Sequence, residues 1–266
     1  MRPKIICHLV SSIDGRLLAD QWTPAESEPD TGTVPICNER LCKRLAADGF
    51  IVGHGSLEAL PLVEAGEAKL GPGRLTTPHF AARKGRKLAV VIDPEGKLHY
   101  ATNDADGSHI VAVLAERVPD DYLAEVRAAG VSYLFAGDDG QDIGSALAQI
   151  GDAFSVETLL LEGGGRLNSI FMNAGLIDEI SLLVCPVING LPGGLDTWEY
   201  AGKLDDSSVI NRCLRHTTTE TLDGGVVWLR YGVEENETAY ARPVFDSSRN
   251  AATTRRTASD DCFLVA

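Results

Sequence analysis

The residues best suited to chemistry follow an apolar segment in the second half of the chain. There, Leu159-Leu160-Leu161 runs directly into Glu162-Gly163-Gly164-Gly165-Arg166-Leu167-Asn168. Glycines at such a turn let backbone N–H groups approach a ligand closely, and the start of a helix adds partial positive charge. Phosphate is the ligand that this turn suits best, although a tight turn that binds nothing would have the same sequence. The spacing is not GxGxxG, so an ordinary Rossmann dinucleotide fold is not indicated.

Two further turns carry polar groups after apolar segments. Phe50-Ile51-Val52 is followed by Gly53-His54-Gly55-Ser56, and the first apolar segment is followed by Ser11-Ser12-Ile13-Asp14-Gly15-Arg16. Open α/β sheets bind ligands at the carboxyl ends of their strands. Each turn could also be purely structural. Two glycine turns in one sheet favour a ligand with two phosphates or an extended dinucleotide.

Other chemistries have less support. The six histidines form no HxH or HExxH pair and the six cysteines form no CxxC pair, so no metal site is expected and the cysteines are expected to be free thiols. The acidic stretch at 138–142 lacks the spacing of a calcium loop. Ser56 lies in Gly-His-Gly-Ser and not in GxSxG, which argues against a serine hydrolase.

Composition narrows the class of protein. The chain has 266 residues, 44% of them hydrophobic, and a formal net charge of −14. Such a charge disfavours nucleic acid and anionic membranes as partners. No apolar run reaches the roughly 20 residues of a membrane span, and no secretory signal is recognisable. We therefore expect a globular, cytoplasmic protein.

Extended apolar segments alternate with helical patterns through most of the chain. The four helical stripes each precede a glycine that is expected to end the helix, namely Gly49, Gly130, Gly151 and Gly175. The expected strands are Lys4–Val10, Phe50–Val52, Leu88–Ile92, His109–Leu114, Val131–Phe135, Val156–Leu161, Glu179–Cys185, Leu214–Glu220 and Gly225–Tyr231.

This alternation predicts an α/β fold with a mixed, mostly parallel sheet and helices on both faces. The last two segments predict a C-terminal antiparallel hairpin with an Asp-Gly turn. We expect one domain over residues 1–232 and a poorly ordered tail over 233–266, where Ser, Thr, Asn, Arg and Ala predominate.

The three turns in this order, followed by Phe171–Glu179 and Cys185–Gly190, resemble the dihydrofolate-reductase-like family that contains the pyrimidine reductases of riboflavin biosynthesis, in a stand-alone form. The resemblance covers about residues 3–232. It implies a three-layer dihydrofolate-reductase-like fold, NADPH (with NADH possible) as cofactor, and a homodimer. It also implies hydride transfer to C1′ of a ribosylamino-pyrimidine 5′-phosphate, which gives the ribitylamino product.

The resemblance also implies roles for individual residues. The residues that would line the cofactor are Ser11, Gly53, Ser56, Gly163, Gly164, Gly165, Arg166, Leu167 and Asn168. Those that would bind substrate are Ser12, Arg44 and Glu162, and those expected to take part in catalysis are Glu162, Arg16 and Asp14.

One segment departs from the family pattern. Where the family often has an aspartate four residues past its threonine and an arginine just beyond, this chain has Leu57-Glu58-Ala59-Leu60 after Ser56. Two alternatives therefore stay open: a reductase of a pterin, folate or specialised-metabolite heterocycle with the same cofactor site, and a non-catalytic nucleotide-binding protein.

Overall fold

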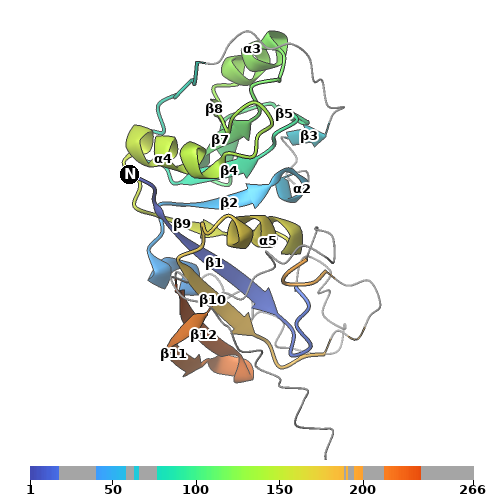
Figure 1. The fold of residues 1–266 in the computed structure, drawn as a ribbon, viewed down its shortest axis with the longest axis vertical. Coiled ribbons are helices and arrows are strands. Elements are labelled where there is room, and N and C mark those ends of the chain that lie inside the picture. The colour runs from blue at the N-terminus through green and yellow to red at the C-terminus, as the bar shows by residue number, and fades with distance from the viewer. Residues whose placement is uncertain are drawn as a thin grey trace, which may run out of the picture. The chain divides into compact units, whose positions relative to one another are not determined.

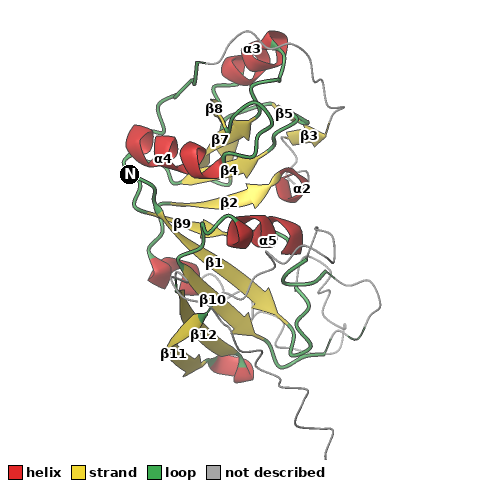
Figure 2. Cartoon of the chain, in the orientation of Figure 1, coloured by secondary structure: helices red, strands yellow, loops and turns green. Residues whose placement is uncertain are grey.

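The residues that the structure describes form a ten-stranded sheet with helices on both faces (Figures 1 and 2). The computed structural model describes residues 1–17, 40–57, 63–65, 77–188, 190, 195–199 and 213–234. The predicted tail falls almost wholly outside these residues, so the domain boundary near 232 stays a prediction. Within the described residues, no helix is both long enough and apolar enough to cross a membrane.

Seven strands of the large sheet are parallel. In spatial order they are β10 (Glu179–Val184), β1 (Lys4–Ser11), β9 (Thr158–Leu161), β2 (Gly49–Gly53), β4 (Leu88–Ile92), β7 (Ser108–Leu114) and β8 (Ser132–Phe135). Antiparallel strands extend the sheet. Strands β12 (Val227–Val233) and β11 (Leu214–Thr221) lie beyond β10, and the short β6 (Asp104–Ala105) pairs with the start of β7, which also pairs with β8. The predicted mixed, mostly parallel sheet and C-terminal hairpin are therefore confirmed. The short strands β3 (Val63–Ala65) and β5 (Leu98–Tyr100) form a separate antiparallel pair.

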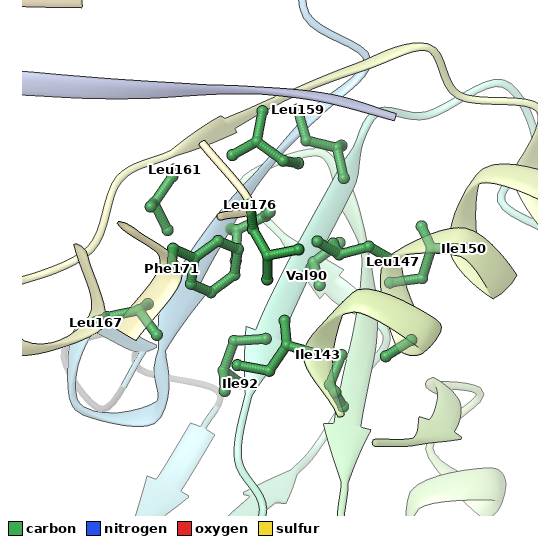
Figure 3. Packing of buried hydrophobic residues seen from close by; sticks show 14 of the residues in the cluster. Val90, Ile92, Ile143, Leu147, Ile150, Leu159, Leu161, Leu167, Phe171 and Leu176 are labelled. Carbon is green, nitrogen blue, oxygen red and sulfur yellow. The ribbon is translucent and has the colours of Figure 1, made fainter. Parts of the chain in front are cut away.

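The helices form the outer layers. The helices α4 (Ile143–Phe154) and α5 (Gly165–Asn173) pack against the sheet face that carries Ile5, Leu159 and Val90 (Figure 3). The opposite face carries α3 (Asp120–Ala128) and a helical turn at 40–45. Because every strand in the middle of the sheet is covered on both sides, β4 and β7 are buried along their whole length.

Two of the four predicted helix ends are wrong, for one physical reason. The glycines at 130 and 175 take left-handed φ values of 74° and 67° after their helices, as predicted. Helix α4, however, passes through Gly151 and ends at Phe154, where Ser155 takes φ 53°. A Cβ at Gly151 would overlap the Met1 carbonyl oxygen, and one at Gly49, inside β2, would overlap that of Leu88. Both glycines therefore serve close packing.

The hairpin turn and the cysteines were also predicted, whereas several short elements were not. The hairpin turn is a 3₁₀ turn over Asp223–Gly225. The described cysteines, Cys7, Cys42, Cys185 and Cys213, are free thiols as expected, whereas Cys37 and Cys262 lie outside the described residues. The sequence did not predict the short elements β3, β5, β6 and α2 (His54–Leu57), which are two to four residues long.

We expect Gly49→Ala to destabilise the protein by about 1–3 kcal/mol, because the added methyl group has no room beside the Leu88 backbone. Thermal and urea unfolding measure this loss. Gly55→Ala is the matched control, since an added Cβ there meets nothing within 4 Å. Equal stability of the two variants would contradict the packing role of Gly49.

Candidate functional site

The three polar turns found in the sequence meet at one edge of the sheet. Strand β9 lies between β1 and β2 and runs parallel to both, so all three strands end on the same side (Figure 1). The turn after β9 is therefore flanked by the turn after β1 and by α2 after β2. This arrangement confirms the prediction that the turns share the carboxyl edge of the sheet.

The glycine turn after β9 leads into α5 through Gly164, which is exposed, and Gly165, which is buried. Gly164 precedes the first helical residue with φ −72° and ψ 169°, and no side chain caps the helix there. The first turn contains no acidic residue and carries the exposed Arg166. The first backbone N–H groups of a helix lack partners within it, and they carry partial positive charge. This end of α5 therefore suits a phosphate group.

The three glycines of the turn differ in what they allow. A Cβ on Gly163 would come within 3.1 Å of both Leu167 and Asn168, and a Cβ on Gly165 would overlap the Asp196 carbonyl oxygen. A Cβ on Gly164 would meet nothing within 4 Å. The packing of the protein itself therefore requires glycine at 163 and 165, and only Gly164 presents bare backbone to a ligand.

Asn168 and Leu167, both predicted to line the cofactor, are buried. The Asn168 amide donates to the carbonyl oxygens of Gly163 at 3.2 Å and Thr197 at 3.1 Å. It thereby ties the turn to the segment at 195–199. Its Oδ1 atom is buried, has no hydrogen-bond partner among the described residues, and lies beside Gly163. Leu167 belongs to the core beneath α5 (Figure 3) and packs beside Gly163, so it supports the glycine turn from the interior of the protein.

The turn after β1 is held by its own polar residues. The Ser12 hydroxyl donates to Asp14 at 2.5 Å, and Asp14 accepts the Gly190 N–H at 3.1 Å. Arg16 forms an ion pair with Asp196. These contacts join the turn to the segments around 190 and 195–199. The substrate and catalytic roles of these three side chains stay predictions.

Glu162 lies at the centre of the edge, directly after β9. The Cys42 thiol of the helical turn at 40–45 donates to its Oε1 atom at 3.7 Å. Burial raises the pKa of the Glu162 carboxyl group, and the Cys42 hydrogen bond and the charge of Lys87 oppose that rise. Burial, followed by the neighbouring Glu162, raises the pKa of the Cys42 thiol to about 12. The thiol is therefore protonated near neutral pH, and the carboxyl group can exchange a proton closer to neutrality than an exposed glutamate.

The structure adds His8, a residue that the sequence analysis did not single out. The pairing of Cys7 with Leu161 places His8 level with Glu162 on the neighbouring strand. His8 is buried, and its Nδ1 atom lies 2.9 Å from the Ser181 hydroxyl, which also accepts the Trp228 indole N–H at 2.8 Å. The sequence did carry a signal for His8. Side chains of a strand point alternately to its two faces, so His8 lies on the same face as Ile6, which the turn at 40–45 covers.

The remaining predicted residues lie farther from Glu162: Arg44 contacts β11 and β12, and the others lie at the ends of β1 and β2 or in α2. The Arg44 guanidinium is exposed, makes a bidentate ion pair with Glu220 at 3.0 and 2.8 Å, and stacks 4.6 Å above the Trp228 ring. To bind a substrate phosphate, as predicted, the Arg44 guanidinium would have to release the Glu220 carboxylate or bind both anions at once. Gly53 ends β2, and the buried Ser11 ends β1. Ser56 lies in α2, but its side chain and the departing segment at 58–60 are outside the described residues.

Comparison with known proteins decides the family. A family model described as the RibD C-terminal domain matches residues 3–227. The chain belongs to this family. The predicted resemblance to the riboflavin-biosynthesis pyrimidine reductases is thus confirmed.

Two archaeal relatives carry the same name, 2,5-diamino-6-ribosylamino-4(3H)-pyrimidinone 5′-phosphate reductase. The protein from Methanothermobacter thermautotrophicus is 25% identical over 198 residues, which are 71% of this chain and 81% of the relative. The protein from Archaeoglobus fulgidus is 26% identical over 197 residues, 71% of this chain and 83% of the relative.

Solved structures share the fold. A pyrimidine reductase-like protein from Corynebacterium diphtheriae has a TM-score of 0.59 at 15% identity, over 88% of this chain and 93% of its own. A riboflavin biosynthesis reductase from Saccharomyces cerevisiae has a TM-score of 0.53 at 12% identity, over 88% and 90% of the two chains. The predicted three-layer fold of the reductase family is therefore confirmed.

A serine–histidine contact at the opposite end of the sheet has a structural role. The Nε2 atom of His109 lies 2.7 Å from the Ser132 hydroxyl, as in a nucleophile–base pair. Arg86, however, donates to the Nδ1 atom of His109 at 3.1 Å, so Nε2 carries the hydrogen and cannot accept the proton of the serine. Burial lowers the pKa of His109 to about 4. The imidazole of His109 is therefore neutral and its contact with Ser132 is structural, in agreement with the absence of a hydrolase motif.

The raised pKa of Glu162 predicts a pH-dependent effect of Glu162→Gln on stability. A carboxyl group with a raised pKa binds its proton more tightly in the folded state, so wild-type stability falls as pH rises through that range. Glutamine does not titrate. The melting temperature of the variant relative to wild type should therefore increase between about pH 4 and about pH 8.

Glu95→Gln is the control for this experiment, because the ion pair with Lys97 lowers the pKa of the exposed Glu95 carboxyl group. Its effect on the relative melting temperature should have the opposite sign and be small. A Glu162→Gln difference that does not change with pH would show that the carboxyl group titrates normally.

Proposed function

We propose that this RibD C-terminal domain protein is an NADPH-dependent reductase that transfers hydride to C1′ of a ribosylamino-pyrimidine 5′-phosphate and forms the ribitylamino product. The observation that carries the proposal is the juxtaposition, at one sheet edge, of a half-buried carboxyl group and an open glycine turn at a helix start. The names of the two archaeal relatives supply the substrate class.

The residues at this edge fit a dinucleotide. Gly164 and the uncapped start of α5 would hold the pyrophosphate, with Arg166 nearby as an exposed cation. Gly53 at the end of the neighbouring β2 would lie along the same ligand. When bound, the nicotinamide supplies the hydride. NADPH in preference to NADH is part of the proposal, as is the homodimer implied by the family resemblance.

The protein would contribute orientation and hydrogen bonds. In the proposed reaction, C1′ of the ring-opened imine would receive the hydride and the imine nitrogen would take up one proton, so that the sugar would be reduced at the expense of the nicotinamide. Glu162 would hold the polar edge of the pyrimidine, because its shielded carboxyl group offers a strong hydrogen bond in a site of reduced polarity. Holding both reactants in contact is the larger share of such catalysis.

The decisive experiment incubates the protein with NADPH and, separately, the deaminated and the non-deaminated ribosylamino-pyrimidine phosphate. Loss of the near-ultraviolet absorbance of the reduced nicotinamide, with the ribitylamino product identified by mass, supports the proposal. NADPH binding without turnover of either compound would overturn the substrate and favour the heterocycle-reductase or the nucleotide-binding alternative. No NADPH binding at all would overturn the cofactor site.

Gly164→Asp should abolish NADPH binding, because it puts a side chain and a negative charge at the point where the backbone is open. Gly164→Ala should weaken NADPH binding with little change in melting temperature, since its backbone angles suit any residue. Calorimetry and thermal unfolding measure the two effects. Normal NADPH affinity of the aspartate variant would show that the phosphates bind elsewhere.

Arg44→Ala should raise the KM for the pyrimidine phosphate about ten- to hundredfold without changing the affinity for NADPH. Glu220→Gln is the matched variant, because it removes the negative charge that forms the ion pair with the Arg44 guanidinium. If a substrate phosphate takes this place, Glu220→Gln should lower the KM. A similar rise of KM in both variants would instead indicate that the ion pair has a structural role.

A further inference from the structure

The helical turn at 40–45 is fixed to the sheet on both sides of one cysteine. Leu41 is buried and packs with Leu183 and Trp228, and Leu45 packs with Ile6 and Leu160. These two leucines are one helical turn apart, so the position of the helix over the sheet is set by apolar contacts. Cys42 follows Leu41 and packs into the second of these clusters. Its side chain is therefore held at a defined place above the carboxyl end of β9.

Glu162 is held at two points. Its backbone N–H donates to the Ile51 carbonyl oxygen at 2.9 Å, which fixes the main chain against β2. Its carboxyl group accepts the Cys42 S–H at Oε1, 3.7 Å from the sulfur. Among the hydrogen bonds between described side chains, this is the one that Glu162 makes. A single donor sets the direction of this half-buried carboxyl group. One of its oxygens therefore accepts a hydrogen bond from the protein, and the other accepts none from the described side chains.

We infer that Cys42 is a positioning residue, which fixes one oxygen of the Glu162 carboxyl group and leaves the other for the substrate. The inference rests on the proposed function of Glu162. A thiol suits this place because sulfur is large enough to make the contact at 3.7 Å, where a serine hydroxyl would need 2.5–3.0 Å. A thiol is also a weak donor, so it orients the carboxyl group without forcing it to remain ionised.

The test compares Cys42→Ala and Cys42→Ser, each in the wild-type and the Glu162→Gln background. Cys42→Ala should lower kcat about three- to tenfold and leave the KM for NADPH unchanged, because one weak hydrogen bond to the substrate-binding group is lost. The serine variant should recover little of this loss, because its hydroxyl would lie too far from Oε1 for a hydrogen bond. In the Glu162→Gln background, Cys42→Ala should have no further effect, since the group that it positions is altered.

The pH profile provides a readout that a purely structural role would not move. Loss of the donor should shift the ionisation of Glu162 in the kcat profile to higher pH, because the Cys42 hydrogen bond lowers the pKa of that carboxyl group. Cys213→Ala is the control, since this free thiol lies directly before β11, four strands away from β9 in the sheet. It should leave both kcat and the profile unchanged.

Two outcomes would overturn the inference: an unshifted pH profile in Cys42→Ala, or an equal fall of kcat in both backgrounds. The pH dependence of the melting temperature tests the contact between Cys42 and Glu162 independently of the proposed enzymatic activity. If the wild type reduces none of the pyrimidine phosphates, the function fails, yet the pH dependence of the melting temperature still reports Glu162. Cys42→Ala should then change that dependence in the wild-type background and not in the Glu162→Gln background. The same change in both backgrounds would overturn the positioning role by itself.

Discussion

The parallel pairing of β1, β9 and β2 is the constraint on which the site depends. Parallel strands end on the same side of a sheet, so the segments that follow them are brought together although β1, β2 and β9 end at Ser11, Gly53 and Leu161. Helix α5 can then begin at the central position. Burial of the strands on both faces keeps the register fixed, because a slip by one residue would turn core side chains toward the wrong layer.

The site itself is divided between the two layers. Helix α5 presents backbone N–H groups above one face, and the helical turn at 40–45 covers the other, where Glu162 and Cys42 meet. A ligand that needs both a phosphate cradle and a carboxyl group would therefore bridge the edge of the sheet. Such a division suits a reaction between two bound molecules, each held by its own layer.

Polar residues at the edge also hold the protein together. Asp14 accepts a backbone N–H of Gly190, Arg16 pairs with Asp196, and Asn168 donates to Thr197. These bonds join the loops after β1 and β10 to the start of α5. The residues predicted for catalysis and cofactor binding therefore build the rim of the site, and substitutions there would change its shape as well as its contacts.

The sequence by itself determined the α/β class, the nine described strands of four or more residues and the three turns, since strand alternation and glycine position are local properties. Only the tertiary structure decided what each residue contacts. It showed that Gly49 and Gly151 allow close packing, that Gly164 alone of its triplet faces open space, and that Arg44 pairs with Glu220. It also brought Cys42 and His8 to the face of Glu162. The physical reason is that these contacts join segments far apart in the chain. The residues next to a position in the sequence do not determine which distant residue packs against it.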